Sequence, residues 1–306
     1  MAGESHSIDR QGLFLALGAH AIWGSMPVYL LLVKQVPAVE FVAWRVIITL
    51  PICLAFIFQR KLIGEMRGVL RDRKAMLSLL GSALLVGANW LIYVWAIQHD
   101  HVYAASIGYY ILPLLMMLLG LIVLREKMSA PQWIAVGLAA IAVTVLALEE
   151  LATLWVSLGL ASSFALYGLL RKTVAARALV GLTLESIILM PIAAVIALIY
   201  AAGPDGSSLT HSWGQGLSIA LGGPMTAIPL LCFAAAARRL PMVFMGFLQF
   251  LSPTIVFGMG LFVFHEELHI AQLLAFLLIW SGVGLFIWHQ WKSAKSRSAL
   301  QATRKT

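Results

Sequence analysis

The sequence predicts an all-α integral membrane protein of ten transmembrane helices, arranged as two inverted five-helix repeats with the N- and C-termini cytoplasmic. Three observations support this. Apolar residues make up 61% of the 306-residue chain and charged residues only 11%, whereas a soluble domain carries about 25% charged residues. Loops rich in lysine and arginine alternate with loops that carry few of them. Finally, stretches of sequence recur at a constant offset of 140 residues, as Gly120 and Gly260 do.

Ten apolar segments are each long enough to cross about 30 Å of hydrocarbon. The breaks between them are short and carry turn residues or charge, for example 99-HDH-101 and 203-GPDGSS-208. The predicted spans are 11–34, 39–58, 75–98, 103–124, 131–148, 153–171, 180–201, 213–236, 242–263 and 269–291.

Basic residues gather in every second loop. The loop 59–74 is rich in lysine and arginine, and so, two spans later each time, are the loops near Arg125, Arg177 and Arg238 and the tail 292–306. The loops between them carry mainly Asp and Glu. Because lysine and arginine favour the cytoplasmic side of a membrane, both termini are expected there.

Matching positions 140 residues apart define the two repeats, 1–148 and 149–291, which precede the basic cytoplasmic tail 292–306. An odd number of spans in each repeat places the second copy in the opposite orientation. Inverted repeats of this kind are typical of transporters that work by alternating access. The matched pairs include Glu126 with Glu266, Gln132 with Gln272, Pro113 with Pro253, and Arg45 with Glu185.

The composition and charge also limit the kinds of partner and cofactor that are expected. The net charge of +8 is explained by loops that orient the chain in a lipid bilayer, so no nucleic acid is expected. Cys53 and Cys232 fall inside apolar runs, and no ligand cluster predicts a metal site or a cofactor. No phosphate-binding loop, zinc-hydrolase motif or nucleophile elbow is present, which argues against an enzyme.

Polar and aromatic side chains inside the spans are the candidates for a substrate cavity. An unsatisfied polar group in hydrocarbon costs about 2–7 kcal/mol, so these side chains should face protein or a cavity. Cavity lining and helix packing both remain open for them, and His20 also fits a hydrogen-bonded structural histidine. The candidates are His20, Trp23, Asn89, Trp90, Tyr93, Tyr109, Tyr110, Ser163, Tyr167 and Gln249.

Two ionisable residues, Arg45 and Glu185, lie inside predicted spans, where such residues are functional by default. They occupy matching positions in the two repeats, near opposite faces of the membrane, and are not expected to pair. Arg45 could snorkel toward headgroups. Glu185 is too short to snorkel well, so a role in an internal vestibule or in proton coupling is considered for it.

Several stretches resemble the drug/metabolite transporter superfamily, with two EamA-type repeats, and within it the RarD-like group and its YddG-like relatives. The stretches are 89-NWLIYVWAI-97, 108-GYYILPL-114, 166-LYGLLRK-172, 229-PLLCFAAAARRL-240 and 247-FLQFLSPT-254. The resemblance implies ten helices, a central cavity between the halves, and export of metabolites or drugs across a bacterial inner membrane. Arg125-Glu126-Lys127 departs from the Gly-Glu common in the family, which should alter loop chemistry only.

The function expected is therefore that of a secondary transporter exporting small amphipathic molecules, with amino acids, aromatic compounds or drugs as cargo. Protons are a candidate coupling partner through Glu185. Two alternatives remain: an integral-membrane enzyme acting on lipid, and a nonenzymatic membrane scaffold or receptor. Flux in proteoliposomes separates the three.

Overall fold

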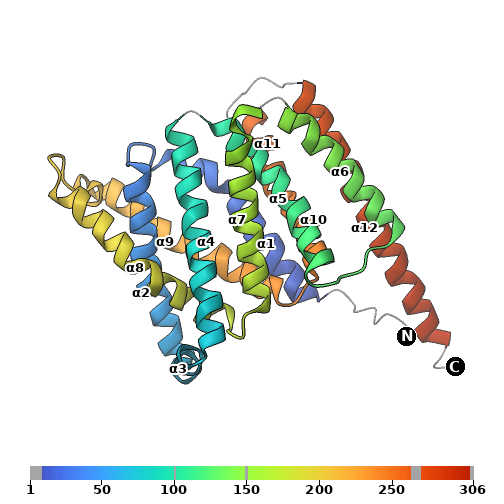
Figure 1. Ribbon diagram of the computed structural model, residues 1–306, viewed down its shortest axis with the longest axis horizontal. Helices are drawn as coiled ribbons and strands as arrows, with labels where there is room; N and C mark the ends of the chain where they lie inside the picture. The colour runs from blue at the N-terminus through green and yellow to red at the C-terminus, as the bar shows by residue number, and fades with distance from the viewer. Residues whose placement is uncertain (1–8, 100, 149–150, 263–269, 304–306) are drawn as a thin grey trace.

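The computed structural model describes residues 9–99, 101–148, 151–262 and 270–303. Within these ranges the regular secondary structure is helical, and the long helices lie side by side as one bundle (Figure 1). The helices of the first half are α1 (Arg10–Leu31), α2 (Ala38–Gln59), α3 (Ile63–Arg71), α4 (Arg73–Gln98), α5 (Val102–Ile122) and α6 (Ala130–Leu148). Those of the second half are the short η1 (Leu151–Thr153), α7 (Leu154–Thr173), α8 (Ala178–Ala202), the short η2 (Ser208–Thr210), α9 (Trp213–Ala237), α10 (Met242–Gln249), α11 (Leu251–Phe262) and α12 (Ile270–Thr303).

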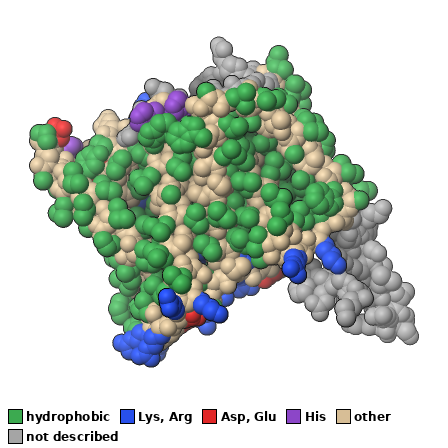
Figure 2. Space-filling model, in the orientation of Figure 1, with side chains coloured by type: hydrophobic (Ala, Val, Ile, Leu, Met, Phe, Trp, Pro, Cys, Tyr) green, Lys and Arg blue, Asp and Glu red, His purple; other side chains and the backbone are tan. Residues whose placement is uncertain are grey.

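The bundle has the surface of a membrane protein. Nine helical segments among the described residues are long and apolar enough to span a bilayer, and a further apolar stretch, Leu273–Trp288, lies within α12. Hydrophobic side chains cover much of the face shown in Figure 2, whereas lysine and arginine gather along its lower edge. Helix α1 begins and α12 ends at this same edge (Figure 1). The all-α membrane fold predicted from composition is confirmed.

Helix α3 lies in the loop predicted for residues 59–74. It is amphipathic: Ile63 and Met66 pack against the cluster that contains Val69 and Ile57, while Arg67 and Arg71 stay exposed. An interfacial helix of this kind satisfies its backbone hydrogen bonds internally, which an irregular loop at the membrane surface does not. The basic loop is thus mostly a short helix lying against α4.

The ninth predicted span, 242–263, is divided into α10 and α11 at Phe250. The Phe250 amide donates to Phe247 O at 3.3 Å, a tightened turn that ends the first piece three residues before Pro253. The two pieces have different neighbours, because α10 packs on α5 and α11 packs on α1. Pro113, the residue matching Pro253, lies inside a continuous α5. Glu266 falls outside the described residues.

The two halves are interleaved. Helix α2 packs on α8 and α9, α4 on α7 and α8, and α5 on α7 and α10; α1 lies against α9 and α11, and α6 against α12. Close approach of α5 to α10 depends on Gly246, because a Cβ there would lie 2.6 Å from Met117 Cγ and 2.7 Å from Pro113 O. The central polar residues consequently come from helices of both halves.

Candidate functional site

A narrow cavity lies where α2 and α4 of the first half meet α8 and α9 of the second. Its volume is about 10 Å³, on the order of one water molecule. Four of the ten side chains around it are polar or ionisable. The lining residues are Val46, Thr49, Val86, Trp90, Leu182, Glu185, Ser186, Leu189, Thr226 and Leu230.

Arg45, on α2, contacts two of the residues that line this cavity, Thr226 and Trp90. Its Nε donates to Thr226 Oγ1 at 2.7 Å, and Thr226 in turn donates to Gly222 O at 2.7 Å. The guanidinium carbon lies 5.2 Å from the centre of the Trp90 ring and 5.6 Å from that of Phe41. Cation–π contacts on two sides and one hydrogen bond fix the head group inside the bundle.

Two tyrosines continue the aromatic wall beside Arg45. The rings of Tyr93 on α4 and Tyr109 on α5 meet edge-to-face with centroids 6.2 Å apart, and both side chains lie near Arg45, as Tyr29 does. Tyr109 is 39% exposed, and Trp90, Tyr93 and Arg45 are half-buried. We call Arg45, Trp90, Tyr93 and Tyr109 the Arg45 group, a partly exposed cluster of one cation and three amphipathic rings.

A second group of aromatic candidates packs between helices. Tyr167 is 1% exposed, and its ring stacks on Phe233 with centroids 6.3 Å apart. Trp23 contacts the same Phe233 at 5.6 Å. His20 is fully buried, with Nδ1 3.1 Å from Ser252 Oγ on α11 and with Nε2 lacking a partner. These side chains join α1, α7, α9 and α11, which is a packing arrangement.

The remaining polar candidates also link helices. Asn89 Nδ2 donates to Leu160 O at 2.9 Å and to Ser163 Oγ at 3.0 Å, which ties α4 to α7. Gln249 is 5% exposed, and its Oε1 has no partner. Tyr110 is half-buried against the main core. The structure therefore places only some of the candidates, the members of the Arg45 group, around an intramembrane charge.

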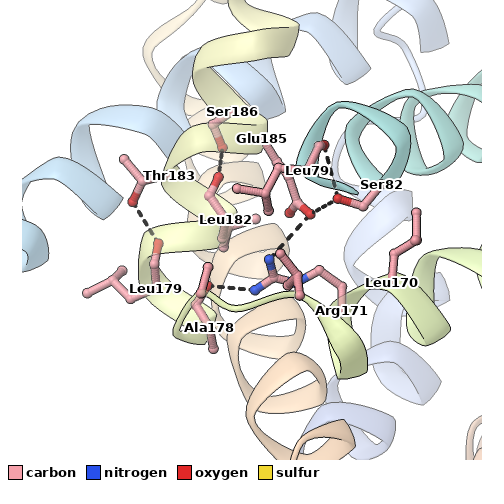
Figure 3. Close-up of polar contacts among 12 residues, drawn as sticks. Leu79, Ser82, Leu170, Arg171, Ala178, Leu179, Leu182, Thr183, Glu185 and Ser186 are labelled. Carbon is pink, nitrogen blue, oxygen red and sulfur yellow. Dashed lines mark hydrogen bonds and ion pairs between the residues drawn. The ribbon is translucent and has the colours of Figure 1, made fainter. Parts of the chain in front are cut away.

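Glu185 also lines the cavity and belongs to a buried polar cluster (Figure 3). Its Oε1 is 3.5 Å from Arg171 Nη1, and the side chains of both residues are at most 2% exposed. The Ser82 hydroxyl on α4 donates to the same oxygen, while Oε2 has no partner. Arg171 Nη2 also donates to Ala178 O at 2.9 Å. Glu185 and Arg45 thus have separate partners.

Three functional candidates were missed from the sequence. Arg171 was counted among the cytoplasmic loop residues, yet it is fully buried, and Gly181 leaves the space that its guanidinium occupies. Thr226, the partner of Arg45, belongs to an apolar run. Glu40 is fully buried and accepts hydrogen bonds from Ser207 Oγ at 2.9 Å and Ser208 Oγ at 2.5 Å. The sequence did offer one signal for Glu40, which is an acidic residue placed one position after the start of the predicted span 39–58.

Glu126 in the charged loop closes the lower edge of the bundle. Its two carboxylate oxygens accept from the amides of Met242 at 2.7 Å and Val243 at 2.8 Å, at the start of α10. Lys172 Nζ lies 3.9 Å from Glu126 Oε1 and donates to Leu240 O at 2.5 Å. We call this arrangement the Glu126 latch. It joins the loop before α6 to α7 and α10.

The fold and these clusters define a polytopic helical membrane protein with polar clusters where its two halves meet. The EamA-like transporter family matches residues 10–148. An uncharacterized transporter of Pseudomonas aeruginosa is 37% identical over 94% of this chain and 96% of its own length. RarD of Escherichia coli strain K12 is 36% identical over 91% and 94%, and RarD of Streptomyces exfoliatus 36% over 99% and 96%.

This chain belongs to the EamA-like transporter family, with RarD proteins among its homologues. A solved crystal structure of another protein shares the fold, with a TM-score of 0.69 at 17% identity over 91% of this chain and 98% of that one. In the described residues no group of three metal-ligating side chains is found.

Proposed function

We propose that the chain is a secondary transporter of the bacterial inner membrane that exports small amphipathic metabolites: amino acids, aromatic compounds or drugs. Cargo would enter between the two halves, which expose the site alternately to either side. The observation that carries the proposal is the Arg45 group beside the cavity shared by α2, α4, α8 and α9. Aromatic walls with few charges suit ligands of this class.

The reciprocal placement of Arg45 and Glu185 supports an inverted repeat. Arg45, on the second spanning helix of the first half, bonds to a hydroxyl on α9, the third of the second half. Glu185, on the second spanning helix of the second half, accepts from a hydroxyl on α4, the third of the first half. The helix contacts are reciprocal too. The third spanning helix of the first half, α4, packs on the first of the second half, α7, and the third of the second half, α9, packs on the first of the first half, α1.

Counterflow into proteoliposomes tests the proposal. Vesicles with purified protein are preloaded with one unlabelled compound and mixed with its labelled form, using aromatic amino acids, aliphatic amino acids and aromatic drugs in turn. We expect transient labelled uptake for at least one class, and none in protein-free vesicles. Folded protein that exchanges no compound of the panel would contradict the proposal. Altered lipids in the same vesicles, detected by mass spectrometry, would instead indicate an enzyme.

A further inference from the structure

The positive charge of the Arg45 group has no counter-ion among the described residues. Among the described residues, Arg45 is in no ion pair, and only its Nε is hydrogen-bonded. A guanidinium has five N–H donors in a rigid fork, so four remain available on its two Nη atoms. Neither Nη atom is enclosed without a partner, unlike Arg171 Nε. Both Nη atoms therefore keep some exposed surface as well as unused donors.

The surroundings hold the Arg45 side chain against α9. Phe41 lies one turn earlier on α2 and belongs to a buried apolar cluster with Tyr29, Val33, Val36 and Ile219. Gly222 on α9 leaves room for the Arg45 stem, because a Cβ there would lie 3.0 Å from Arg45 Cγ. With the stem and Nε both held against α9, the guanidinium stays at the cavity and below the end of the helix.

We propose that Arg45 binds the carboxylate of the cargo, and that the cargo is a small carboxylic acid with an aromatic or apolar body. A carboxylate matches the guanidinium fork with two parallel hydrogen bonds. The rings of Trp90, Tyr93 and Tyr109 would contact the apolar body, and their arrangement suits offset or edge-to-face stacking. The inference rests on the proposed transport function, whose cargo it specifies.

A carboxylate fits this site better than a phosphate or a cationic drug does. A phosphate ester is a dianion at neutral pH and is usually bound by several basic groups, whereas Arg45 is the only basic side chain in the Arg45 group. A cationic cargo would be repelled by the guanidinium at short range. A zwitterion such as an amino acid remains compatible, because its ammonium can turn toward the rings.

Binding of matched acids and amides to the protein in lipid nanodiscs, measured by calorimetry, tests this directly. The probes are phenylacetate with phenylacetamide, indole-3-acetate with indole-3-acetamide, and phenylalanine with phenylalaninamide. Hydrogen bonds to a charged group contribute about 1.5–3 kcal/mol, so we expect at least one acid to bind about 10- to 100-fold more tightly than its amide. Wild-type protein that binds no acid of the panel in preference to its amide overturns the inference.

Variants assign the preference to Arg45. In Arg45→Gln the acid should lose about 10- to 100-fold in affinity while the amide changes little. In Arg45→Lys, which keeps the charge and loses the fork, an intermediate preference is expected, and this variant serves if Arg45→Gln does not fold. Arg60→Gln removes an exposed charge at the far end of α2 and is the matched control. An equal loss for acid and amide in Arg45→Gln assigns Arg45 to structure.

Counterflow of labelled phenylalanine and indole-3-acetate, measured alongside binding, separates the two proposals. Acid-selective binding without counterflow of any panel compound supports the Arg45 site and contradicts transport. Counterflow of other compounds, with acids and amides bound equally, supports transport and contradicts the Arg45 site. Acid-selective binding together with counterflow of the same acid supports both.

Discussion

At the scale of single residues, the site depends on how two intramembrane charges are held. Arg45 has hydroxyl and aromatic partners, while Glu185 has Arg171 and Ser82. The Arg171–Glu185 pair is long at 3.5 Å, and each member keeps one unsatisfied polar atom, Arg171 Nε and Glu185 Oε2. Buried ion pairs with incomplete hydrogen bonding contribute little net stability. The pair is thus better suited to change during a transport cycle than to hold the fold together.

Proton exchange at Glu185 is the first prediction at this scale. Glu185→Gln should abolish the effect of a pH gradient on net flux and leave exchange under symmetric conditions intact, because the amide keeps the shape and cannot release a proton. Arg171, Tyr167 and Cys53 are the titratable groups that interact with Glu185. Flux into proteoliposomes with and without a proton gradient is the measurement.

A control is needed because Glu185→Gln leaves Arg171 buried without a counter-charge, which costs about 3–5 kcal/mol in a typical buried pair. The double variant Arg171→Met/Glu185→Gln removes both charges and should recover thermal stability while remaining insensitive to pH. Wild-type flux that ignores a proton gradient would rule out proton coupling. A Glu185→Gln protein that keeps the wild-type pH profile would assign the coupling elsewhere.

The residues of the site were predicted only in part. Trp90, Tyr93, Tyr109 and Arg45 could be named because aromatic and charged residues are conspicuous in apolar spans. The sequence could not show that these four residues lie together, because their proximity depends on how α2, α4 and α5 pack in three dimensions. Thr226 was not named, since a threonine in an apolar run carries no signal, and its role follows from a partner 181 positions away. Arg171 was misplaced because its burial depends on the space at Gly181.

At the scale of elements, the Glu126 latch anchors the start of α10. Helix amides at an N-terminus lack internal partners and favour a negative charge. The side chain of Glu126 satisfies two of them although it comes from a distant loop. Sequence alone assigned this carboxylate to loop chemistry, because a capping residue is normally sought next to the helix that it caps.

Removing this cap gives the second prediction. Glu126→Ala should destabilise the protein by about 1–2 kcal/mol, the usual contribution of an N-terminal cap with a charge. Glu65→Ala is the comparison variant: Glu65 accepts only one backbone amide at the start of a helix, that of Arg177 at 3.3 Å, and pairs at 3.1 Å with an Arg177 side chain that is 69% exposed, so a smaller change of about 0–1 kcal/mol is expected. Thermal unfolding in detergent compares them, and equal shifts would show that the cap contributes nothing special.

Element boundaries followed from hydropathy except at three places. The α3 helix was predicted to be a loop because the segment was interpreted from its charges alone. The spacing of Ile63, Met66 and Val69 places these residues on one face of a helix and would have indicated the helix. The division at Phe250 lies within an apolar run, and only Pro253 hinted at a bend there. The last predicted span, 269–291, ended too early, because α12 continues through most of the predicted basic tail to Thr303.

At the scale of the whole molecule, the charges along the lower edge of the bundle predict its orientation. Lys127 and Asp205 are both exposed, and they belong to loops predicted on opposite sides of the membrane. Ser207, in the same loop as Asp205, is buried against Glu40 and is unsuitable for labelling. The repeat architecture and cytoplasmic termini stay predictions that this pair of positions can test.

Cysteine labelling is the third prediction. In a variant with Cys53→Ala and Cys232→Ala, a single cysteine at Asp205 should react with a membrane-impermeant maleimide added to intact cells. A single cysteine at Lys127 should react only after the membrane is permeabilised, because the positive-inside rule places that loop in the cytoplasm. Labelling of both positions from the same side would contradict the inverted arrangement of 1–148 and 149–291.

The solitary charge of Arg45 has an electrical consequence. If the cargo carboxylate neutralises the guanidinium, a carrier loaded with a simple acid moves no net charge at this position, whereas the empty carrier returns with an exposed cation. Moving one elementary charge through a full membrane potential of 100 mV changes free energy by about 2.3 kcal/mol. Voltage would then act on the return of the empty carrier and leave the loaded step almost untouched, so the cell's membrane potential would set the rate of recycling.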